Sequence, residues 1–191
     1  MKLDNTFVVP IPVEQAWPLL LDVPLIAPCL PGAELTEVLG PQHYRGRALL
    51  KVGPVQLVFE GEAQVVHIDD TAKTARVLAK GSDKKGRGNA SATVEFAITE
   101  HSDGARVNVC TELNLVGAVA QYGRGAGLLK AIADQLIGQF ANNLDAALRG
   151  TSGDVSAQPS AGGTPVSGLR LVGSAIKRMA KNKFGRDDVS K

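Results

Sequence analysis

Residues 55–65 read Val-Gln-Leu-Val-Phe-Glu-Gly-Glu-Ala-Gln-Val, with apolar or small side chains at the odd positions and mostly polar ones between them. Successive side chains of a β-strand point to opposite faces, so this alternation predicts a strand with one apolar face. The same period recurs in residues 74–80, 88–99 and 105–116, with Gly, Pro, Asp and Ser between these runs. The sequence therefore predicts an antiparallel meander with one polar and one apolar face.

The period becomes helical after Gly117. Large apolar residues recur every four positions, which predicts an amphipathic helix over about 120–148 whose stripe is buried against the sheet: Leu128, Ile132, Leu136, Phe140, Leu144 and Leu148. A short strand at residues 6–9, a helix from Pro12 to Leu21 and short proline-broken helical pieces precede the meander. We therefore expect an α+β fold in which one curved sheet wraps around one long helix.

The chain changes composition near Gly150. Residues 150–168 are rich in Gly, Ser, Pro and Ala and have almost nothing to bury. Residues 169–191 hold seven Lys or Arg and two Asp, a net charge of +5. Since the whole chain carries +2, residues 1–168 carry −3. We predict a globular domain over 1–149, a disordered linker over 150–168 and a basic tail over 169–191.

The basic tail has helical periodicity. On a helix its apolar side chains would share one face and its basic side chains the adjoining arc, as in helices that lie in a membrane interface. The expected membrane-binding residues are Leu169, Arg170, Val172, Ile176, Lys177, Arg178, Met179, Lys181 and Phe184. Docking in a protein groove, or folding back on the domain, remains an alternative. Nucleic acid is disfavoured because no aromatic residues are interleaved with the charges.

Several features bear on the cellular compartment. The N-terminal residues contain no apolar run of the kind that forms a signal peptide, and no uncharged apolar stretch reaches 18 residues. Cys29 and Cys110 lie far apart in sequence, which fits a reducing environment. We expect a cytoplasmic protein that is peripheral on the inner face of the cell membrane.

Catalytic and metal-binding patterns are weak. The three histidines are more than 20 residues apart, so no metal site is expected, and a small buried thiol explains Cys29 better than a nucleophile. The glycines of residues 123–127 lack the spacing of a phosphate-binding loop and are interpreted as close packing. Residues 83–87 (Asp-Lys-Lys-Gly-Arg) are interpreted as a solvated hairpin tip, with an anionic partner surface as the alternative.

The inward face of the predicted sheet is almost wholly apolar. Strand parity places Glu60, Glu62, Glu95 and Glu112 outside and leaves Thr111 as the clear inward hydroxyl. Such a surface lacks acid–base groups but suits an apolar ligand, unless its side chains simply fill a core. Tyr122 and Arg124 are predicted as polar groups at the mouth, near the helix start, that can meet a carbonyl oxygen; an exposed helix N-terminus is the alternative. The candidate ligand-binding residues are Leu57, Phe59, Val94, Phe96, Leu113, Leu115, Tyr122, Arg124, Ile132, Leu136 and Phe140.

Five segments carry a resemblance to a known family. They are residues 12–17 (Pro-Val-Glu-Gln-Ala-Trp), 29–33 (Cys-Leu-Pro-Gly-Ala), 51–55 (Lys-Val-Gly-Pro-Val), 86–92 (Gly-Arg-Gly-Asn-Ala-Ser-Ala) and 115–125 (Leu-Val-Gly-Ala-Val-Ala-Gln-Tyr-Gly-Arg-Gly). In this order the chain resembles the CoxG-like family of carbon monoxide dehydrogenase subunits, within the START-like (SRPBCC) superfamily, over residues 1–148. The resemblance implies a helix-grip fold with seven strands.

The same resemblance implies a function. Proteins like this accompany molybdenum-containing CO dehydrogenases or related hydroxylases and are linked to membrane attachment, so we expect an accessory protein and no enzyme. No covalent cofactor is expected. The apolar inward faces and the basic amphipathic tail, taken together, motivate the hypothesis that the cavity holds a lipophilic quinone, menaquinone or ubiquinone, and couples the dehydrogenase to the respiratory chain. The alternatives are a ligand-free membrane adaptor or assembly factor and, least favoured, a cyclase-like enzyme.

Overall fold

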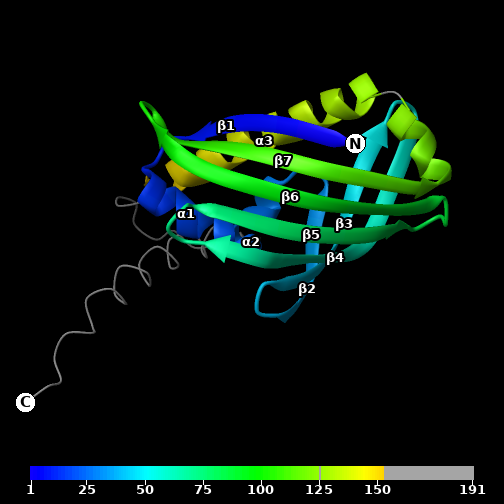
Figure 1. Cartoon of the computed structure of the whole chain (residues 1–191), viewed down its shortest axis with the longest axis horizontal. Helices are drawn as coiled ribbons and strands as arrows, with labels where there is room; N and C mark the ends of the chain where they lie inside the picture. Colours follow the sequence, from blue (N-terminus) through cyan, green and yellow to red (C-terminus); the bar gives the residue numbers. More distant parts are fainter. Residues whose placement is uncertain (125, 153–191) are drawn as a thin grey trace, which may run out of the picture. The chain divides into compact units, whose positions relative to one another are not determined.

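A computed structural model describes residues 1–124 and 126–152 of the chain, and Met1–Leu144 forms one compact unit. Its centre is an antiparallel sheet with the strand order β1-β7-β6-β5-β4-β3-β2 (Figure 1). The strands are β1 (Lys2–Val9), β2 (Ala33–Gly40), β3 (His43–Val52), β4 (Val55–Asp69), β5 (Thr74–Asp83), β6 (Gly88–His101) and β7 (Gly104–Gly117). The predicted meander and α+β class are confirmed.

The sheet is completed by its first strand. β2 to β7 each pair with the next strand in sequence, and β1 then adds to β7 with Leu3 opposite Thr111. The α-amino group of Met1 donates a hydrogen bond to the carbonyl of Leu113 at 2.6 Å. β1 is therefore longer than the expected strand at residues 6–9, because pairing with β7 extends it to Lys2.

The sequence analysis missed β2, which follows the predicted proline-broken segment. The register between β2 and β3 shifts at Leu35/Glu37 and again at Val38/Gly40. Each shift moves the next side chain to the other face, so the alternation that identifies a strand is lost over these eight residues.

Three short helices connect β1 to β2. They are α1 (Val13–Leu21), α2 (Val23–Ile26) and the 3₁₀ segment η1 (Ala27–Cys29), as the prolines of this region predict. Trp17 packs α1 against the sheet. Its indole Nε1 donates a hydrogen bond to Asp70 Oδ1 at 2.7 Å, and its ring centroid lies 5.9 Å from that of Phe96. The carboxylate of Asp22 accepts a hydrogen bond from the amide of Leu25 at 3.2 Å and caps α2.

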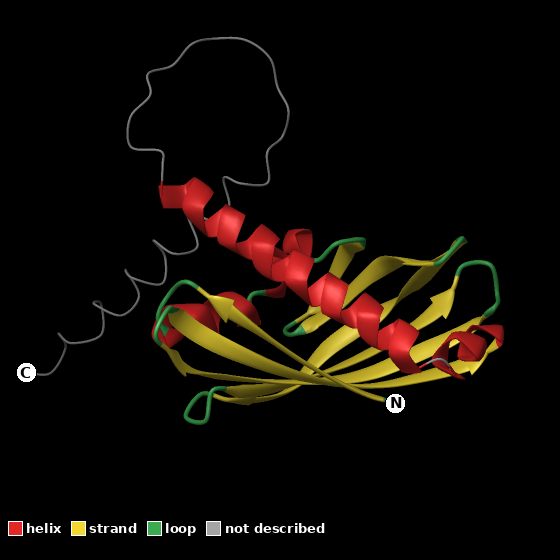
Figure 2. Ribbon diagram, turned by 90° about the horizontal axis from the view of Figure 1, so that it is seen from above, coloured by secondary structure: helices red, strands yellow, loops and turns green. Residues whose placement is uncertain are grey.

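The long helix α3 spans Ala126–Ser152, and its part up to Leu144 crosses the concave face of the sheet (Figure 2). The rings of Phe140 and Phe7 meet edge to face at 5.6 Å, and Asn143 Nδ2 donates to the carbonyl of Cys29 at 2.9 Å. The segment before it is the 3₁₀ helix η2 (Ala118–Arg124), so the α-helix begins later than the expected residue 120.

The predicted helical stripe is buried only in part. Phe140 and Leu144 are buried, whereas Leu128 is 46 % exposed. Residues four apart advance by 40° around a helix, so an i+4 series drifts away from a single face and its first member turns to solvent. The predicted linker from residue 153 onward and the whole tail, residues 169–191, lie outside the described residues.

Candidate ligand-binding cavity

A cavity of about 560 Å³ lies between the inner face of the sheet and α3. Its walls come from all seven strands, from α1 and α2, and from the sheet-facing side of α3. Apolar side chains dominate them. A volume of this size falls within the usual range of small-molecule sites.

The structure brings nine of the eleven predicted residues to the wall of this cavity: Leu57, Phe59, Val94, Phe96, Leu113, Leu115, Tyr122, Ile132 and Phe140. Leu57, Phe59 and Phe140 are buried, while the others are half-buried because they border open space. This placement follows from strand parity and from the sheet-facing arc of α3.

Two of the eleven predicted ligand-binding residues, Leu136 and Arg124, are not among these nine. Leu136 is half-buried on α3 but does not line the cavity; Leu129 and Ile137 line it instead. The cavity is wider than the row of apolar residues four apart on α3, so it also contacts side chains on either side of that row. A search for residues four apart does not identify these side chains. For Arg124, the side chain lies outside the described part of the structure. Thr111, the expected inward hydroxyl, is half-buried and also stands away from the cavity wall.

The sequence analysis missed Tyr44. It lies opposite Ala63 across β3 and β4, so its side chain shares the inward face, and it is only 8 % exposed. Burial, followed by the nearby carboxylate of Asp22, raises the pKa of the Tyr44 hydroxyl. The hydroxyl is therefore protonated at neutral pH. The alternation of Arg45, Arg47 and Lys51 with inward neighbours is the signal that identifies this face of β3.

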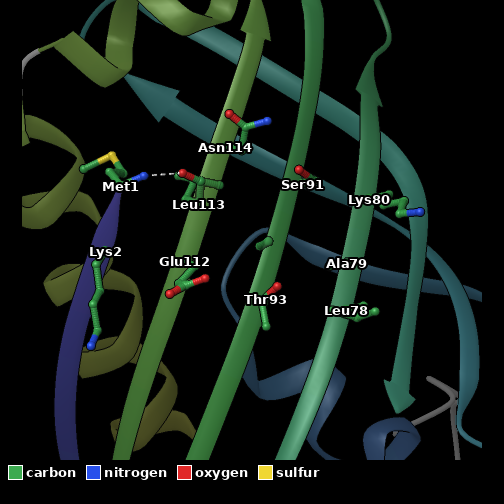
Figure 3. A pocket seen from close by; sticks show the side chains of 11 residues that line it. Met1, Lys2, Leu78, Ala79, Lys80, Ser91, Thr93, Glu112, Leu113 and Asn114 are labelled. Carbon is green, nitrogen blue, oxygen red and sulfur yellow. Dashed lines mark hydrogen bonds between the residues drawn. The ribbon is translucent and has the colours of Figure 1, made fainter.

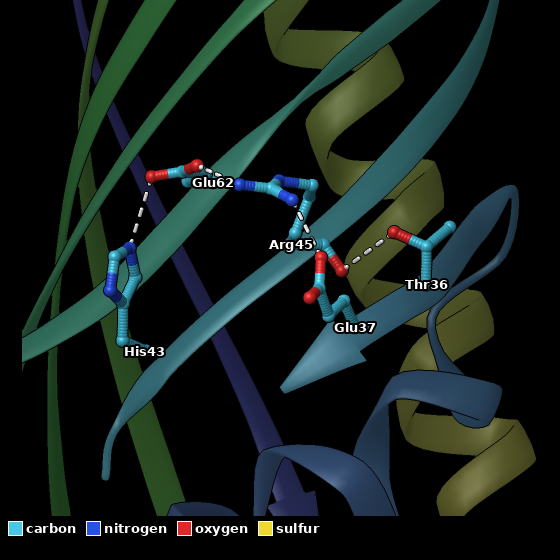
Figure 4. A network of polar contacts seen from close by, with 5 residues as sticks. All are labelled: Thr36, Glu37, His43, Arg45 and Glu62. Carbon is cyan, nitrogen blue, oxygen red and sulfur yellow. Dashed lines mark hydrogen bonds and ion pairs between the residues drawn. The ribbon is translucent and has the colours of Figure 1, made fainter. Parts of the chain in front are cut away.

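The four predicted outward carboxylates are exposed, and those of Glu60, Glu62 and Glu95 form ion pairs. Glu62 accepts a hydrogen bond from Arg45 Nη2 at 2.9 Å and makes a 3.0 Å contact with His43 Nε2, while Arg45 Nη1 reaches Glu37 at 2.6 Å (Figure 4). The hydrogen bond from Arg45 and, after it, the one from His43 lower the pKa of Glu62. These charged side chains are therefore engaged with one another on the outer face of the sheet.

A second hollow of about 580 Å³ crosses the outer face of β1, β7, β6 and β5 (Figure 3). Its walls carry short polar or charged side chains, such as Ser91, Thr93 and Asn114. Thr93 borders this hollow but not the inner cavity, whereas Ala92 borders both and shares the inward parity of Val94, so Thr93 faces outward. The pair provides matched inner and outer positions on one strand.

The interpretation of residues 83–87 as a solvated tip is wrong for the first and the last residue, because Asp83 is buried and Arg87 is half-buried. The side chain of Asp83 has no exposed surface and accepts hydrogen bonds from Arg87 Nε, Arg87 Nη2 and the amide of Lys85. The bonds from Arg87 hold the pKa of Asp83 well below its usual range. Asp83 has the inward parity of Ala79 and Gly81, so burial overrides the local charge composition. Lys84, Lys85 and Gly86 are exposed, as expected.

The close-packing interpretation of residues 123–127 also fails for the described glycines. A Cβ placed on Gly127 meets no atom within 4 Å, and one on Gly123 makes an ordinary 3.8 Å contact with Leu115. The tight glycines lie in the sheet instead: a Cβ on Gly61 would overlap the carbonyl oxygen of Lys80.

In residues 1–124 and 126–152, no three His, Cys, Asp or Glu side chains are grouped to hold a metal ion. Within the same ranges, every helix is too short or too polar to cross a bilayer.

Comparisons with known proteins agree with this architecture. The family model described as the G subunit of carbon monoxide dehydrogenase (CoxG) matches residues 6–149. No curated protein matches the sequence significantly.

Solved structures with the same fold are distant in sequence. A conserved protein from Geobacillus kaustophilus is 19% identical, with 79% of this chain and 97% of that chain covered and a TM-score of 0.67. A Thermus thermophilus protein is 18% identical (77% and 99% covered, TM-score 0.53). The Zhui aromatase/cyclase from Streptomyces sp. R1128 is 12% identical (83% and 99% covered, TM-score 0.55). At these identities the likeness shows the helix-grip fold alone.

Proposed function

Because the chain belongs to the CoxG family of carbon monoxide dehydrogenase subunits, we propose that it is an accessory protein that recruits a molybdenum-containing CO dehydrogenase, or a related hydroxylase, to the cytoplasmic membrane. In this proposal the domain also binds a lipophilic quinone, menaquinone or ubiquinone, and couples the dehydrogenase to the respiratory chain. A dehydrogenase in the aqueous phase has no direct access to a quinone dissolved in lipid, and a bound carrier would bridge that gap.

The observation that carries the quinone proposal is the apolar cavity beneath α3. A quinone has a flat ring with two carbonyls and a long isoprenoid chain, so a site for it needs a large apolar surface and few polar groups. The cavity meets both needs, since its volume is about 560 Å³ and the inward residues of β4 to β7 that line it are apolar or small. Burying this much apolar surface of a ligand is favourable by about 25 cal/mol per Å².

Binding is favoured over catalysis by the chemistry of the inner face. The charged residues on the strands beside the cavity, such as Arg45, Arg47 and Glu62, have their side chains in exposed ion pairs on the outer face. A cyclase-like reaction needs an acid or base close to the reacting atoms. Among the described side chains at the inner wall, the ionisable groups are the hydroxyls of Tyr44 and Tyr122. We therefore propose a carrier.

The membrane part of the proposal rests on residues 169–191. Each basic residue near an anionic surface contributes about 1 kcal/mol, so the net charge of +5 favours reversible binding that the apolar residues strengthen. The 19 residues of the linker would give the domain a reach of roughly 25 Å from the membrane as a flexible coil.

The quinone proposal is tested on the full chain purified from a quinone-producing host. We expect native mass spectrometry and organic extraction to find bound isoprenoid quinone. Ala92→Phe, which fills the cavity, should abolish this binding, and Thr93→Phe, on the outer face of the same strand, should retain it. Circular dichroism establishes that both variants fold. A wild-type chain that is empty and takes up no added quinone would leave the adaptor alternative.

A further inference from the structure

The floor of the cavity is built from glycine and alanine across four neighbouring strands. Two adjacent rows of inward positions cross the sheet from β3 to β6, and each pair of neighbours in a row is directly opposite in register. One row is Tyr44, Ala63, Ala79 and Ala92, and the next is Gly46, Gly61, Gly81 and Ala90. Tyr44 is the one residue in the two rows with a side chain larger than a methyl group.

These rows form a smooth floor between higher walls. Strands are about 4.8 Å apart and side chains on one face recur every 6.8 Å or so, which gives a floor of roughly 14 Å by 7 Å. On one side the next row is Val65, Val77 and Val94, and on the other side stands Phe59. The two rows end on β7 at Leu113 and Leu115. A surface without ridges makes its largest contact with a flat molecule.

The glycines have a second role, which must be separated from the first. A Cβ on Gly46 would lie 2.5 Å from the carbonyl oxygen of Glu34, and one on Gly61 would overlap that of Lys80. Both glycines therefore allow neighbouring strands to approach closely where the sheet curves. The alanines of the two rows already carry a Cβ and line the cavity, so they are the positions at which the shape of the floor can be tested.

The Tyr44 hydroxyl lies at the end of this floor without a partner. The residue as a whole is 8 % exposed and lines the cavity, but among the described residues its hydroxyl oxygen is not one of the fully buried polar atoms without a partner, so this oxygen borders accessible space. A ligand that enters the cavity with a hydrogen-bond acceptor can therefore receive a hydrogen bond from this hydroxyl. Protonated at neutral pH, the hydroxyl offers a donor.

The chemistry around Tyr44 selects a neutral acceptor. The carboxylate of Asp22 is close enough to act electrostatically on the hydroxyl. A ligand carboxylate or phosphate at this position would be buried beside a like charge, which is unfavourable. A ring carbonyl accepts the hydrogen bond without that repulsion.

We propose that Tyr44 is the residue that recognises the polar group of the ligand, and that a flat ring bearing a carbonyl oxygen lies face down on the glycine and alanine floor beside it. This inference rests on the proposed carrier function and specifies it: the ring lies at the β3 end of the cavity, and the oxygen points to Tyr44. It differs from the sequence-based expectation, which placed a carbonyl near Tyr122 and Arg124.

The test uses two probes that share one ring. Isothermal titration of the full chain with 2-methyl-1,4-naphthoquinone and with 2-methylnaphthalene separates oxygen recognition from ring binding. Tyr44→Phe should weaken the quinone about fivefold, the equivalent of one hydrogen bond of about 1 kcal/mol, and leave the hydrocarbon within about twofold of wild type. Thr93→Val, which removes an outer-face hydroxyl, is the matched control and should change neither.

A second variant tests the floor. Ala79→Leu places a branched side chain in the middle of the first row and should weaken both probes more than about tenfold, whereas Thr93→Leu should not. Unchanged binding in Tyr44→Phe and Ala79→Leu, or a larger loss in Tyr122→Phe, would overturn this inference while the carrier function stands. A wild-type chain that binds neither probe contradicts the carrier function itself.

Discussion

Arg87 grips the buried carboxylate of Asp83 with two hydrogen bonds, from Nε to Oδ2 at 2.8 Å and from Nη2 to Oδ1 at 2.7 Å. The same Nη2 donates to the carbonyl of Gln56 at 2.9 Å, and the carbonyl of Arg87 accepts from the amide of Val119 at 3.1 Å. One ion pair thus joins β4, the β5–β6 turn and η2, the segment that carries Tyr122 to the cavity.

Replacing Asp83 by Asn should lower the thermal midpoint by about 5 °C or more, because an amide NH₂ would face the donors of Arg87. Thermal unfolding followed by circular dichroism measures this. Asp134→Asn, which alters the exposed pair with Lys130, is the control and should shift the midpoint by no more than about 2 °C.

The same variant predicts a pH dependence. The folded pKa of Asp83 lies below the ordinary aspartate value of about 3.9, so its contribution to stability is complete above that pH and falls as the pH drops toward the folded pKa. Chemical denaturation should therefore show a steeper loss of stability below about pH 4 in wild type than in Asp83→Asn. Parallel pH profiles would contradict the assignment of this ion pair.

Gly61→Ala should destabilise the domain by about 2 kcal/mol or more, or prevent it from folding, since the added Cβ overlaps the Lys80 carbonyl and lies 2.6 Å from the Cα of Gly81. Gly40→Ala, at the end of β2, meets no atom within 4 Å and should stay within about 0.5 kcal/mol of wild type. Urea denaturation compares the two, and equal effects would argue against close strand approach at Gly61.

Trp17 provides an intrinsic reporter of the cavity. It is the single tryptophan of the sequence, is 4 % exposed, and contacts Phe96, which lines the cavity. A short-chain ubiquinone should therefore quench its fluorescence with a saturable dependence on concentration. Ala92→Phe should show only the weak linear quenching of collisions in solution; saturable quenching in that variant would place the quinone elsewhere.

The tail is tested by changing its apolar face alone. In the full chain, Ile176→Asp with Met179→Asp should abolish flotation with anionic phosphatidylglycerol vesicles, because charges would enter the acyl region. Ser174→Asp with Asn182→Asp changes the net charge equally but lies opposite the apolar face of the expected helix, so much of the binding should persist. Equal losses in both variants would indicate purely electrostatic attachment.

Much of the fold can be predicted from the sequence, because buried side chains recur with the period of the strand or helix that carries them. The alternation over β4, β6 and β7 identifies their inward residues, and nine of the predicted residues on these strands, on α3 and on η2 reach one cavity. The prediction fails where this periodicity is interrupted. The two register shifts hide β2, and the 3₁₀ turn of η2 displaces the start of α3.

The missed site residues share a different cause. Tyr44 opens β3 among polar neighbours, and Asp83 lies in a run of charges, so local composition describes both as exposed. Their burial depends on which strand lies opposite: Tyr44 faces Ala63, and Asp83 faces Phe59. That information comes from pairing between strands and is absent from either segment alone.

In the cavity floor, glycines allow the strands to approach closely and alanines shape the surface. This difference has a consequence for the evolution of the fold. Gly46 and Gly61 are fixed by the backbone of the adjacent strand, whereas Ala63, Ala79, Ala90 and Ala92 line the cavity with a Cβ already in place. Ligand preference can therefore be altered by single substitutions at the alanines while the scaffold is preserved. The same four positions are where a protein engineer would begin to redesign the cavity for a new molecule.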